Sequence, residues 1–555
     1  MPTRRKFIAQ TTLGAAALAT GAAGCQPSGK PAASGPLTSF FERITGSDAA
    51  IPGQLLGPNQ AAGHRFRDGM AFPQPTKTST TDVLIVGGGV AGLSARRWLH
   101  KQGVRDVLLL ELEEQVGGNA AHGRNTSTAY PWGAHYLPIA DPTDHELIDF
   151  LTESRLITGF DRDLPIYDDY ALCHDPEERL FLHGRWQEGL VPSEGIAEAD
   201  KAQIARFFAL IDTLKKAIGT DGNPAFAIPL DRSSADPAYR QLDAISFATY
   251  LDQQGFTSTY LRWYLAYCCK DDYGSLPEQT SAWAGLHYFA ARRGQAANAN
   301  SSAVLTWPEG NGFLADQLRQ QGASPIQSQA LVYALQRTQA GFEALVYDTR
   351  QHTTARVLAR QVILAIPQFV AVRLLAQLDP DRAKLASAIH YAPWLVANLT
   401  VTDLAQAKGM PLCWDNVLYG ADSVGYIVAN HQHLTDDPQR VLTCYRPLCH
   451  AEPAVARRLA YETAREVWLS QLLDELETAH PGLRAQVQQA DVWVWGHGMV
   501  SPTPGYIWGA TRTQLRQPIT GGIVMAHSDL SGVSIFEEAF HQGILAASHV
   551  LTQLA

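Results

Sequence analysis

Short apolar runs, glycine-rich turns and helical patterns alternate along this chain. Residues 83–86 are apolar, a glycine cluster follows, residues 90–101 have the spacing of an amphipathic helix, and a second apolar run ends at Glu111. A buried strand, a tight turn, a helix and another strand predict a βαβ unit. Apolar runs at 362–366 and 523–526 predict two further strands.

The rest of the chain combines segments with the apolar spacing of helices and segments with the apolar spacing of strands. Helical spacing is found at residues 246–254, 258–268, 281–292, 313–321, 454–479 and 536–554, and short strands are expected at 328–335, 342–347 and 395–401. Residues 26–80 are rich in Pro, Gly, Ala and Ser without a sustained period, so we interpret them as a tether and lead-in. Within them, the charged and aromatic patch at 63–69 is expected to dock on the body.

The glycine cluster has the spacing of a dinucleotide site. Glycines at 87, 89 and 92 allow a tight turn, a close approach of pyrophosphate to the backbone, and close packing of helix on strand. The helix N-terminus adds its positive dipole, and an acid at the end of the next strand accepts hydrogen bonds from a ribose. The residues of this predicted site are Gly87, Gly89, Val90, Ala91, Gly92 and Glu111.

The first 24 residues have the features of an export signal. Arg4, Arg5 and Lys6 precede a short Ala/Gly-rich run, which resembles a twin-arginine signal and predicts a periplasmic protein. That run is too weakly apolar for a lasting membrane span. Ala22-Ala23-Gly24-Cys25 resembles a lipoprotein box, so Cys25 is the candidate lipidation site, with a coincidental cysteine as the alternative.

Composition narrows the class of protein. The 555 residues are 46% hydrophobic and 18% charged, as in globular proteins with two or more cores. Removing residues 1–24 takes away three basic side chains and no acid, which changes the formal charge from −10 to −13 and disfavours nucleic acid as a partner. An acidic protein suits a cationic substrate, although solubility alone also explains the charge. The six cysteines after Cys25 form no CxxC pair and are interpreted as buried thiols, with one or two disulfides as the alternative.

Four separated motifs together resemble the flavin-containing amine oxidase superfamily. They are the GxGxxG unit, the pair Gly117-Gly118 after Glu111, the strand at 362–366 stopped by Pro367, and the terminal strand, polar turn and helix. The segments HGMVSPTPGYIWG and AHSDLSG resemble the bacterial spermidine-dehydrogenase-like branch most closely.

The resemblance implies an α/β fold, in which a Rossmann-like FAD-binding domain built from three chain segments is interleaved with an α+β substrate domain. The expected FAD-binding parts are 81–140, 301–370 and 491–555, and the substrate parts are 141–300 and 371–490, after a signal at 1–24 and a lead-in at 25–80.

It also implies cofactor contacts beyond the first glycine turn. Gly117 and Gly118 would approach the flavin, Val332 the adenine, Asp529 the ribityl and pyrophosphate, and the Phe536 N–H the pyrimidine edge. FAD is expected to be non-covalent because the terminal turn lacks cysteine. Haem is a minor alternative, for which a single histidine, His64, is the candidate ligand.

Three positions depart from the family pattern. Asn119 stands where the family has an arginine, residues 394–398 lack the lysine that many oxidases place near the flavin, and Ile535 replaces a tyrosine of the aromatic cage. The missing lysine favours a dehydrogenase with an unidentified electron acceptor over an efficient oxidase.

An amine substrate requires groups that bind a cation. Asp271 and Asp272 are candidates for the ammonium, with a solvated acid pair as the alternative, and Asp415 is a third acid. Trp283 and His287 would line the same cavity through cation–π or stacking contacts, although an aromatic stripe is more often core.

Residues just before the terminal turn are expected at the flavin face. They are His497, Tyr506 and Trp508, of which His497 would take the amine proton, with a structural histidine as an equal alternative. His431 and His433 lack an evident third metal ligand, so no metal is predicted. The chain has no GxSxG, P-loop or HExxH motif.

The sequence therefore predicts an exported FAD-dependent enzyme that oxidises an amine, with a polyamine as the expected substrate. Two alternatives stay open: a flavin-dependent desaturase or oxidoreductase of a non-amine substrate, and a non-catalytic flavin-binding or NAD-binding lipoprotein.

Overall fold

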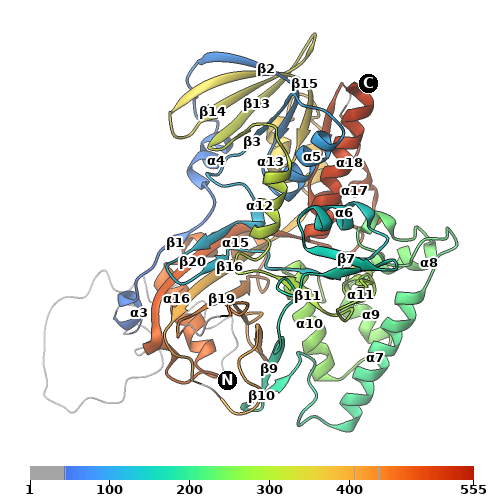
Figure 1. Ribbon diagram of the computed structural model, residues 1–555, viewed down its shortest axis with the longest axis vertical. Helices are drawn as coiled ribbons and strands as arrows, with labels where there is room; N and C mark the ends of the chain where they lie inside the picture. Colours follow the sequence, from blue (N-terminus) through green and yellow to red (C-terminus); the bar gives the residue numbers. More distant parts are fainter. Residues whose placement is uncertain (1–42, 44–45, 406, 435–437, 520, 555) are drawn as a thin grey trace, which may run out of the picture.

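The computed structural model describes residues 43, 46–405, 407–434, 438–519 and 521–554. Two sheets and their helices form the body: one sheet at the top of Figure 1, the other below it, and a group of helices at the lower right. The signal-like segment and Cys25 lie outside the described residues, so export and lipidation stay predictions.

The first sheet brings together three distant parts of the chain. In the described residues its strand order is β12-β3-β2-β15-β14-β13, with β21 paired to β15. Strands β12, β3, β2, β15 and β21 run parallel, and β15, β14 and β13 antiparallel. Their bounds are β2 Pro75–Val86, β3 Val107–Leu110, β12 Ile326–Gln327, β13 Ala330–Thr338, β14 Gly341–Asp348, β15 Thr353–Leu364 and β21 Ile523–Met525.

The parallel centre of this sheet is covered on both faces. Residues 83–86 of β2 are all buried, which explains their continuous apolar run. Helix α5 (Val90–Lys101) packs closely against α18 (Phe536–Leu554), since a Cβ on Gly543 would lie 2.2 Å from the carbonyl oxygen of Ala91. Helix α12 (Gly312–Gln321) packs beside α5.

The second sheet has the strand order β1-β20-β16-β19-β18-β17-β9-β10 within the described chain. On β16, Leu395, Ala397 and Leu399 share a core with helix α16 (Arg465–Leu476), while Trp394 and Val396 belong to the core on the opposite face. This alternation follows from the two-residue period of a strand. The bounds are β1 Leu55–Leu56, β9 Glu178–Leu182, β10 Arg185–Glu188, β16 His390–Val401, β17 Asp415–Leu418, β18 Tyr426–Val428, β19 Arg440–Pro447 and β20 Val487–Ser501.

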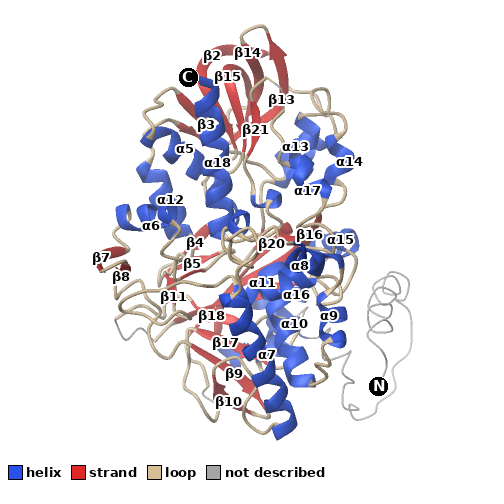
Figure 2. Cartoon of the chain, turned by 90° about the vertical axis from the view of Figure 1, so that its right-hand side faces the viewer, coloured by secondary structure: helices blue, strands red, loops and turns tan. Residues whose placement is uncertain are grey.

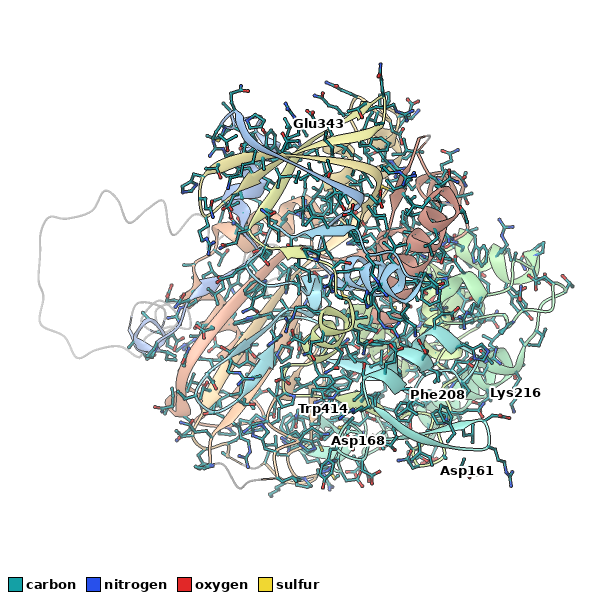
Figure 3. All side chains as sticks on the ribbon, turned by 45° about the horizontal axis from the view of Figure 1, so that its top comes forward. Asp161, Asp168, Phe208, Lys216, Glu343 and Trp414 are labelled. Atoms are coloured by element: carbon teal, nitrogen blue, oxygen red, sulfur yellow. The ribbon has the colours of Figure 1, made fainter. Side chains whose placement is uncertain are left out.

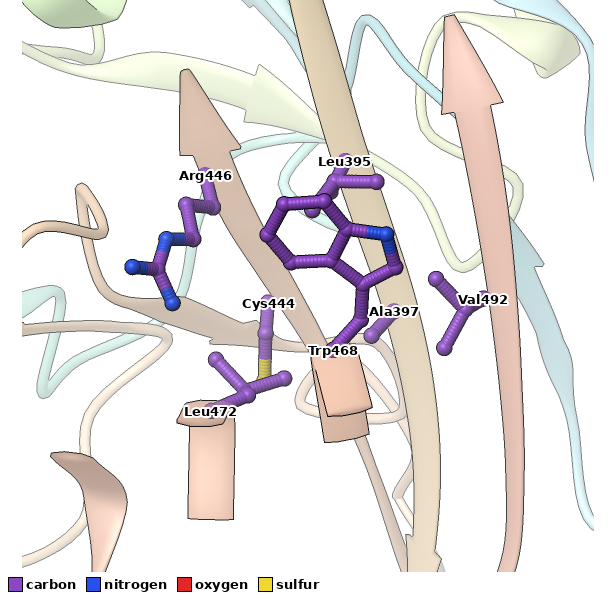
Figure 4. Close-up of a pocket in the computed structure, with 7 residues that line it drawn as sticks. All are labelled: Leu395, Ala397, Cys444, Arg446, Trp468, Leu472 and Val492. Atoms are coloured by element: carbon purple, nitrogen blue, oxygen red, sulfur yellow. The ribbon is translucent and has the colours of Figure 1, made fainter. Parts of the chain in front are cut away.

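A small pocket lies on the α16 side of this sheet (Figure 4). It is bordered mainly by apolar side chains, among them Trp468 and Leu472 of α16, and offers about 10 Å³. That is about the space of one water molecule. It is a packing gap and not a substrate site.

Figure 2 shows the helices α7–α11 as a group in the lower part of the molecule. Three of them, α9, α10 and α11, start at serine caps. Ser246, Ser258 and Ser281 each accept a backbone N–H in the first turn of the helix that follows. The helices are α7 Glu198–Lys216, α8 Pro237–Arg240, α9 Phe247–Gln253, α10 Thr259–Tyr273 and α11 Ala282–Ala290.

The other elements are short. They are β4 His122–Arg124, β5 Ala129–Pro131, β6 Tyr136–Pro138, α6 His145–Glu153, β7 Ile157–Asp161, β8 Leu164–Tyr167, β11 Val304–Thr306, α13 Gln368–Leu374, α14 Arg382–Ala386 and α17 Ala510–Leu515, with 3-10 turns η1 Gly118–Ala120 and η5 Ser528–Leu530 among others. Among the described residues, no helix combines the length and the apolar character needed to cross a bilayer.

Three expectations are corrected. The helix expected at 454–479 is two helices, α15 (Pro453–Glu462) and α16 (Arg465–Leu476), because Thr463 and Ala464 are extended. The lead-in is not a passive tether: α3 (Ser47–Ala50), β1 and α4 (Gln60–Arg67) precede β2, which begins at Pro75. The expected boundary between residues 490 and 491 falls inside β20, a strand of the second sheet.

The six described cysteines are buried free thiols, as expected.

Candidate functional site

The first glycine turn joins β2 to α5. Gly87 has φ 106°, a conformation that favours glycine, and donates its N–H to the carbonyl of Leu110 at 2.8 Å. A Cβ on Gly92 would lie 1.9 Å from the Gly87 carbonyl oxygen, so the helix can approach the turn only with glycine there. Gly87, Gly89 and Val90 remain partly accessible.

The second glycine pair lies against the first turn. The N–H of Gly117 donates to the Gly88 carbonyl at 2.9 Å, and Gly89 and Gly117 form an isolated parallel bridge. A Cβ on Gly118 would lie 3.2 Å from the Cα of Gly89. The two turns therefore form one glycine cradle around the start of α5.

Glu111 is oriented by backbone donors. Its Oε2 accepts the Gly88 N–H at 2.6 Å, and its Oε1 accepts the Glu113 N–H at 2.8 Å. Burial raises the pKa of Glu111, while these hydrogen bonds oppose the rise. The carboxylate is thereby fixed beside the glycine turn.

Asn119 connects the cradle to the second sheet. Its Nδ2 donates to the carbonyl of Gly498 on β20, and its own carbonyl accepts the Ala134 N–H at 2.9 Å. Gly118 and Asn119 are exposed. The position expected to mark a departure from the family thus joins the two halves of the site.

Val332 is buried in β13 opposite Val346. The strand begins at Ala330, whose N–H donates to the Glu111 carbonyl at 2.8 Å. Val332 therefore lies two residues from a direct backbone contact with Glu111.

Asp529 lies in η5, which follows β21, and is 1% exposed. Its Oδ1 is 2.9 Å from Nδ1 of His527, and its Oδ2 accepts the Gln368 N–H at 2.8 Å and the hydroxyl of Tyr391. Burial would raise the pKa of Asp529, but His527 and Tyr391 hold it below its ordinary value. The turn thus presents a fixed, ionised carboxylate.

These donors and acceptors fit a dinucleotide cofactor. The glycine cradle leaves room that a Cβ would fill, the start of α5 supplies backbone N–H groups, and Glu111 and Asp529 supply carboxylates at its two sides. Phe536 begins α18, and its ring stacks on Phe540 with centroids 6.0 Å apart.

Asp272 is not available to a substrate cation. Its carboxylate forms an ion pair with Arg292, with Nη2 3.1 Å from Oδ2. Both acids of the Asp271–Asp272 pair lie in the last turn of α10, which runs five residues beyond the helix expected at 258–268. The alternative of a solvated pair is wrong for Asp272, which is buried.

Asp271 and Asp415 are the two acids of the site that form no ion pair with another described residue. The Asp271 carboxylate makes no hydrogen bond or ion pair with any other described residue. Burial and the charge of Asp272 raise the pKa of Asp271 to about 7. Burial, Glu178 and Asp271 raise the pKa of Asp415 well above its ordinary value. Glu178 is the cross-strand partner of Asp415 in the β9–β17 pair.

Aromatic rings surround these acids. His135 lies between Tyr445, with centroids 4.5 Å apart, and Trp414, at 5.7 Å, and also contacts the ring of Tyr136. Burial, with the charges of Asp271 and Asp415, raises the pKa of Tyr445 well above its ordinary value. Trp414 is labelled in Figure 3 in the lower half of the molecule. We call the set Asp271, Asp415, His135, Tyr136, Trp414 and Tyr445 the acid–aromatic cluster.

The cluster lies near the start of α18. Arg292, Asp272, Asp271 and Glu537 all act electrostatically on Tyr136. Glu537, the second residue of α18, is buried, and burial raises its pKa to about 7. The acids of the cluster and the start of α18 therefore act electrostatically on the same side chain, Tyr136.

Trp283 and His287 fill the core instead of lining this cluster. Their rings stack with centroids 4.8 Å apart, and His287 Nε2 is 2.9 Å from the Ala227 carbonyl oxygen. The other ring contacts of Trp283 are with Phe226 and Trp508. The core alternative explains this helix face.

The three residues expected at the flavin face lie outside the acid–aromatic cluster. His497 stacks on Phe369 at 3.9 Å, and burial followed by the charge of Arg457 lowers its pKa to about 3. Tyr506 donates its hydroxyl to the Asp529 carbonyl at 2.7 Å. Trp508 donates its backbone N–H to Asp243 at 2.8 Å. His497 and Tyr506 therefore support the Asp529 turn, and Trp508 belongs to the helical region.

Sequence reasoning missed six contributors to the site: His135, Tyr136, Glu178, Arg292, Trp414 and Tyr445. The GAHY segment at 133–136 was a usable signal for Tyr136, because it follows the second glycine pair. The described residues contain no group of three or more His, Cys, Asp or Glu placed to hold a metal ion. His64 is exposed on α4.

Comparisons with known proteins agree with this architecture. Residues 85–153 match the NAD(P)-binding Rossmann-like domain family. The chain is 24% identical over 364 residues to chloroplastic protoporphyrinogen oxidase of Oryza sativa subsp. japonica, covering 62% of this chain and 63% of that protein. It is 24% identical over 196 residues to flavin-containing amine oxidase B of Bos taurus, covering 33% of this chain and 38% of that protein.

A solved putrescine oxidase, redesigned in its cofactor binding, superposes with a TM-score of 0.64 at 17% identity, covering 86% of this chain and 100% of that one. The matched part of the chain spans less than two thirds of the length of the protoporphyrinogen oxidase and of the amine oxidase B. The matches confirm the Rossmann-like α/β fold and support a relationship to the flavin-containing amine oxidase superfamily.

Proposed function

We propose that this protein is an FAD-dependent oxidoreductase that oxidises the C–N bond of an amine to an imine, with a polyamine as the substrate class. The observation that supports this most directly is the acid–aromatic cluster next to the start of α18. There the carboxylate of Asp271 makes no hydrogen bond or ion pair with the rest of the described chain.

The charge balance of the cluster favours a cation. Asp271, Asp272, Asp415 and Glu537 are four neighbouring acids, and Arg292 is the base that pairs with one of them. Uncompensated buried carboxylates are costly when ionised, so a bound ammonium would stabilise their charged form. Faces of Tyr136, Trp414 and Tyr445 would add cation–π attraction.

A second pair of acids is suited to binding a second ammonium group. Asp415 and Glu178 lie opposite each other in the β9–β17 strand pair. Glu178 is exposed to solvent, and Asp415 is partly exposed. Asp271 lies on a different element, α10, and would hold the reacting amine. This division of charge favours a diamine or polyamine over a monoamine.

The cofactor would be held by the residues that fit it. Gly87, Gly89, Val90, Ala91 and Gly92 would face the pyrophosphate, and Glu111 the adenosine ribose. Gly117, Gly118 and Asn119 would lie on the flavin side, Val332 near the adenine, Asp529 at the ribityl chain and the Phe536 N–H at the pyrimidine edge. Bound FAD supplies the acceptor for the hydride that leaves the carbon next to the amine nitrogen.

The chain's own groups must bind, deprotonate and position the amine. Hydride loss requires the neutral amine, so the ammonium first gives its proton to a base. Asp271, with a pKa of about 7, is better matched to that task than His497, with a pKa of about 3. We therefore assign proton acceptance to Asp271, and the surrounding rings would exclude water until the imine forms and is hydrolysed.

Export by the twin-arginine route, anchoring at Cys25 and transfer of electrons to an acceptor other than oxygen remain part of the proposal. They are supported by the signal-like residues at 1–25 and by the absence of a lysine at 394–398. The haem alternative gains no further support.

Anaerobic mixing of the purified flavoprotein with a panel of amines tests the proposal. Spermidine and putrescine should bleach the flavin absorbance, and a monoamine of equal chain length should do so more slowly. A protein bleached by no amine but by an apolar non-amine substrate would contradict the amine assignment.

A non-amine reaction is the second candidate. It is favoured by the match to a protein named protoporphyrinogen oxidase, which covers 62% of this chain. A flavoprotein that no substrate bleaches would instead indicate the non-catalytic alternative.

A further inference from the structure

The segment before β2 forms a continuous strap across both sheets. We define the N-terminal strap as residues 51–72, which contain β1 and α4. In Figure 1 this blue segment runs from α3 up to α4 beside the first sheet.

One end of the strap is fixed to the second sheet. Strand β1 runs parallel to β20, with Leu55 opposite Val492. The carbonyl of Pro52 accepts the Ala490 N–H at 2.8 Å, and the Gln54 N–H donates to Oδ1 of Asp491 at 2.9 Å. Asn119, on the glycine cradle, bonds Gly498 of the same strand.

The other end is fixed to the first sheet through aromatic contacts. Phe72 stacks on Tyr333 with centroids 4.0 Å apart and an interplanar angle of 17°. The guanidinium of Arg65 lies 4.9 Å from the Phe72 ring and 4.8 Å from the Tyr347 ring. Arg65 Nη1 also donates to the Tyr347 hydroxyl at 3.2 Å. Leu112 belongs to the same apolar cluster.

Between these anchors the strap reaches the nucleotide site. The N–H of Asn59 donates to Oε1 of Glu113 at 2.8 Å. The N–H of Glu113 donates to Oε1 of Glu111 at 2.8 Å. Asn59 is itself fixed as the cap of α4, because its side chain accepts the Ala62 N–H at 3.2 Å. A chain of hydrogen bonds therefore runs from the strap to the acid expected at the ribose.

We propose that the N-terminal strap is a clasp for the adenosine end of the cofactor, and that Glu113 is a positioning residue that acts through Glu111. This inference rests on the proposed FAD cofactor. Glu113 does not touch the nucleotide: it links the strap to the turn that carries Glu111. Loosening the strap releases that turn and lets the nucleotide leave.

Cofactor release from the full-length holoprotein tests the clasp. Free FAD fluoresces more strongly than bound FAD, so the rise in fluorescence after dilution gives the release rate. Arg65→Ala and Phe72→Ala each remove contacts of the order of a cation–π or aromatic pair, so we expect release to accelerate about tenfold. Met70→Ala is the matched control, because Met70 lies in the same strap with 58% of its surface exposed.

A pair of substitutions at Glu113 separates positioning from general stability. Glu113→Gln keeps an oxygen that accepts the Asn59 N–H, whereas Glu113→Ala does not. We expect release to be several times faster for Glu113→Ala and nearly unchanged for Glu113→Gln. Equal rates for wild type, Glu113→Ala and Arg65→Ala would overturn the clasp while leaving FAD binding intact.

Ligand linkage provides a readout that folding alone would not change. The peptide bond after Arg67 lies at the end of α4 and is a site for trypsin. If the strap clasps the adenosine end, ADP added to FAD-depleted protein should slow cleavage there, because a ligand stabilises the closed form that it prefers. Cleavage unaffected by ADP would contradict the clasp, and a protein that binds neither ADP nor FAD would contradict the proposed function instead.

Discussion

Arg292 holds Asp272 in a buried ion pair, with Nη2 3.1 Å from Oδ2. The two adjacent acids of α10 are thereby divided: one is neutralised inside the protein, and Asp271 is left without a partner among the described residues. A sequence-adjacent pair thus has two different tasks, and variants at the two positions should differ in kind.

Asp271→Asn should impair amine binding without loss of flavin. A hydrogen bond to a charged group contributes about 1.5–3 kcal/mol, so KM for a polyamine should rise about 10- to 100-fold. Anaerobic flavin reduction at varied amine concentration measures this. Glu278→Gln, at an exposed position of the loop after α10, is the matched control. Kinetics equal to wild type would remove Asp271 from the site.

Asp272→Asn should act mainly on stability. Removing one partner of a buried ion pair leaves Arg292 unpaired and costs about 3–5 kcal/mol. Denaturant unfolding of the holoprotein should show this loss, whereas Asp271→Asn should unfold at nearly the wild-type denaturant concentration. An unchanged unfolding midpoint for Asp272→Asn would contradict the buried pair.

The pH dependence should follow the raised pKa of Asp271. The carboxylate must be ionised to accept the amine proton, so kcat/KM should rise with pH up to about 7, and Asp271→Asn should lose this limb. Stability has the opposite sign, because the folded state binds the proton more tightly than the unfolded state does. Without substrate, thermal stability should fall as pH rises from about 4 to about 7. A polyamine should offset this fall, and a flat profile would refute the assignment.

Two glycines of the first turn should respond differently to alanine. Gly89 has φ −70° and its Cβ would meet only the Cα of Gly118, at 3.9 Å, so Gly89→Ala should fold but bind FAD at least about tenfold more weakly. Gly92→Ala would place a Cβ 1.9 Å from the Gly87 carbonyl oxygen and should destabilise the fold by about 1–3 kcal/mol. Melting curves and flavin content of both variants check this. Normal flavin content in Gly89→Ala would mean that the turn does not face the pyrophosphate.

Elements with a strong local period were predictable from the sequence. The helix at 90–101 matches α5, the apolar run at 83–86 lies in β2, and the run at 362–366 begins in β15, which ends at Leu364. The break between α15 and α16 was not predictable, because apolar spacing continues across Thr463 and Ala464 although their backbone is extended. Strand β1 has two residues, too few to show a period.

The site was predictable only in part, for a similar reason. The acids expected at 271 and 415 do interact electrostatically, but Glu178 is brought to Asp415 by strand pairing across more than 200 residues. No local pattern contains that register. Trp283 and His287 were expected beside them as rings for cation–π or stacking contacts, yet they occupy the helix face that packs into the core.

Strand β21 pairs with residues 362–364 of β15, and α18 packs on α5. The first sheet therefore receives a central neighbour only when residues beyond 520 have been synthesised, long after β2 and α5 have left the ribosome. Until then, the apolar surfaces of β15 and α5 that these elements cover are open to chaperones and to other chains. Insertion of the proposed FAD must therefore wait for the Asp529 turn, which follows β21 in the chain.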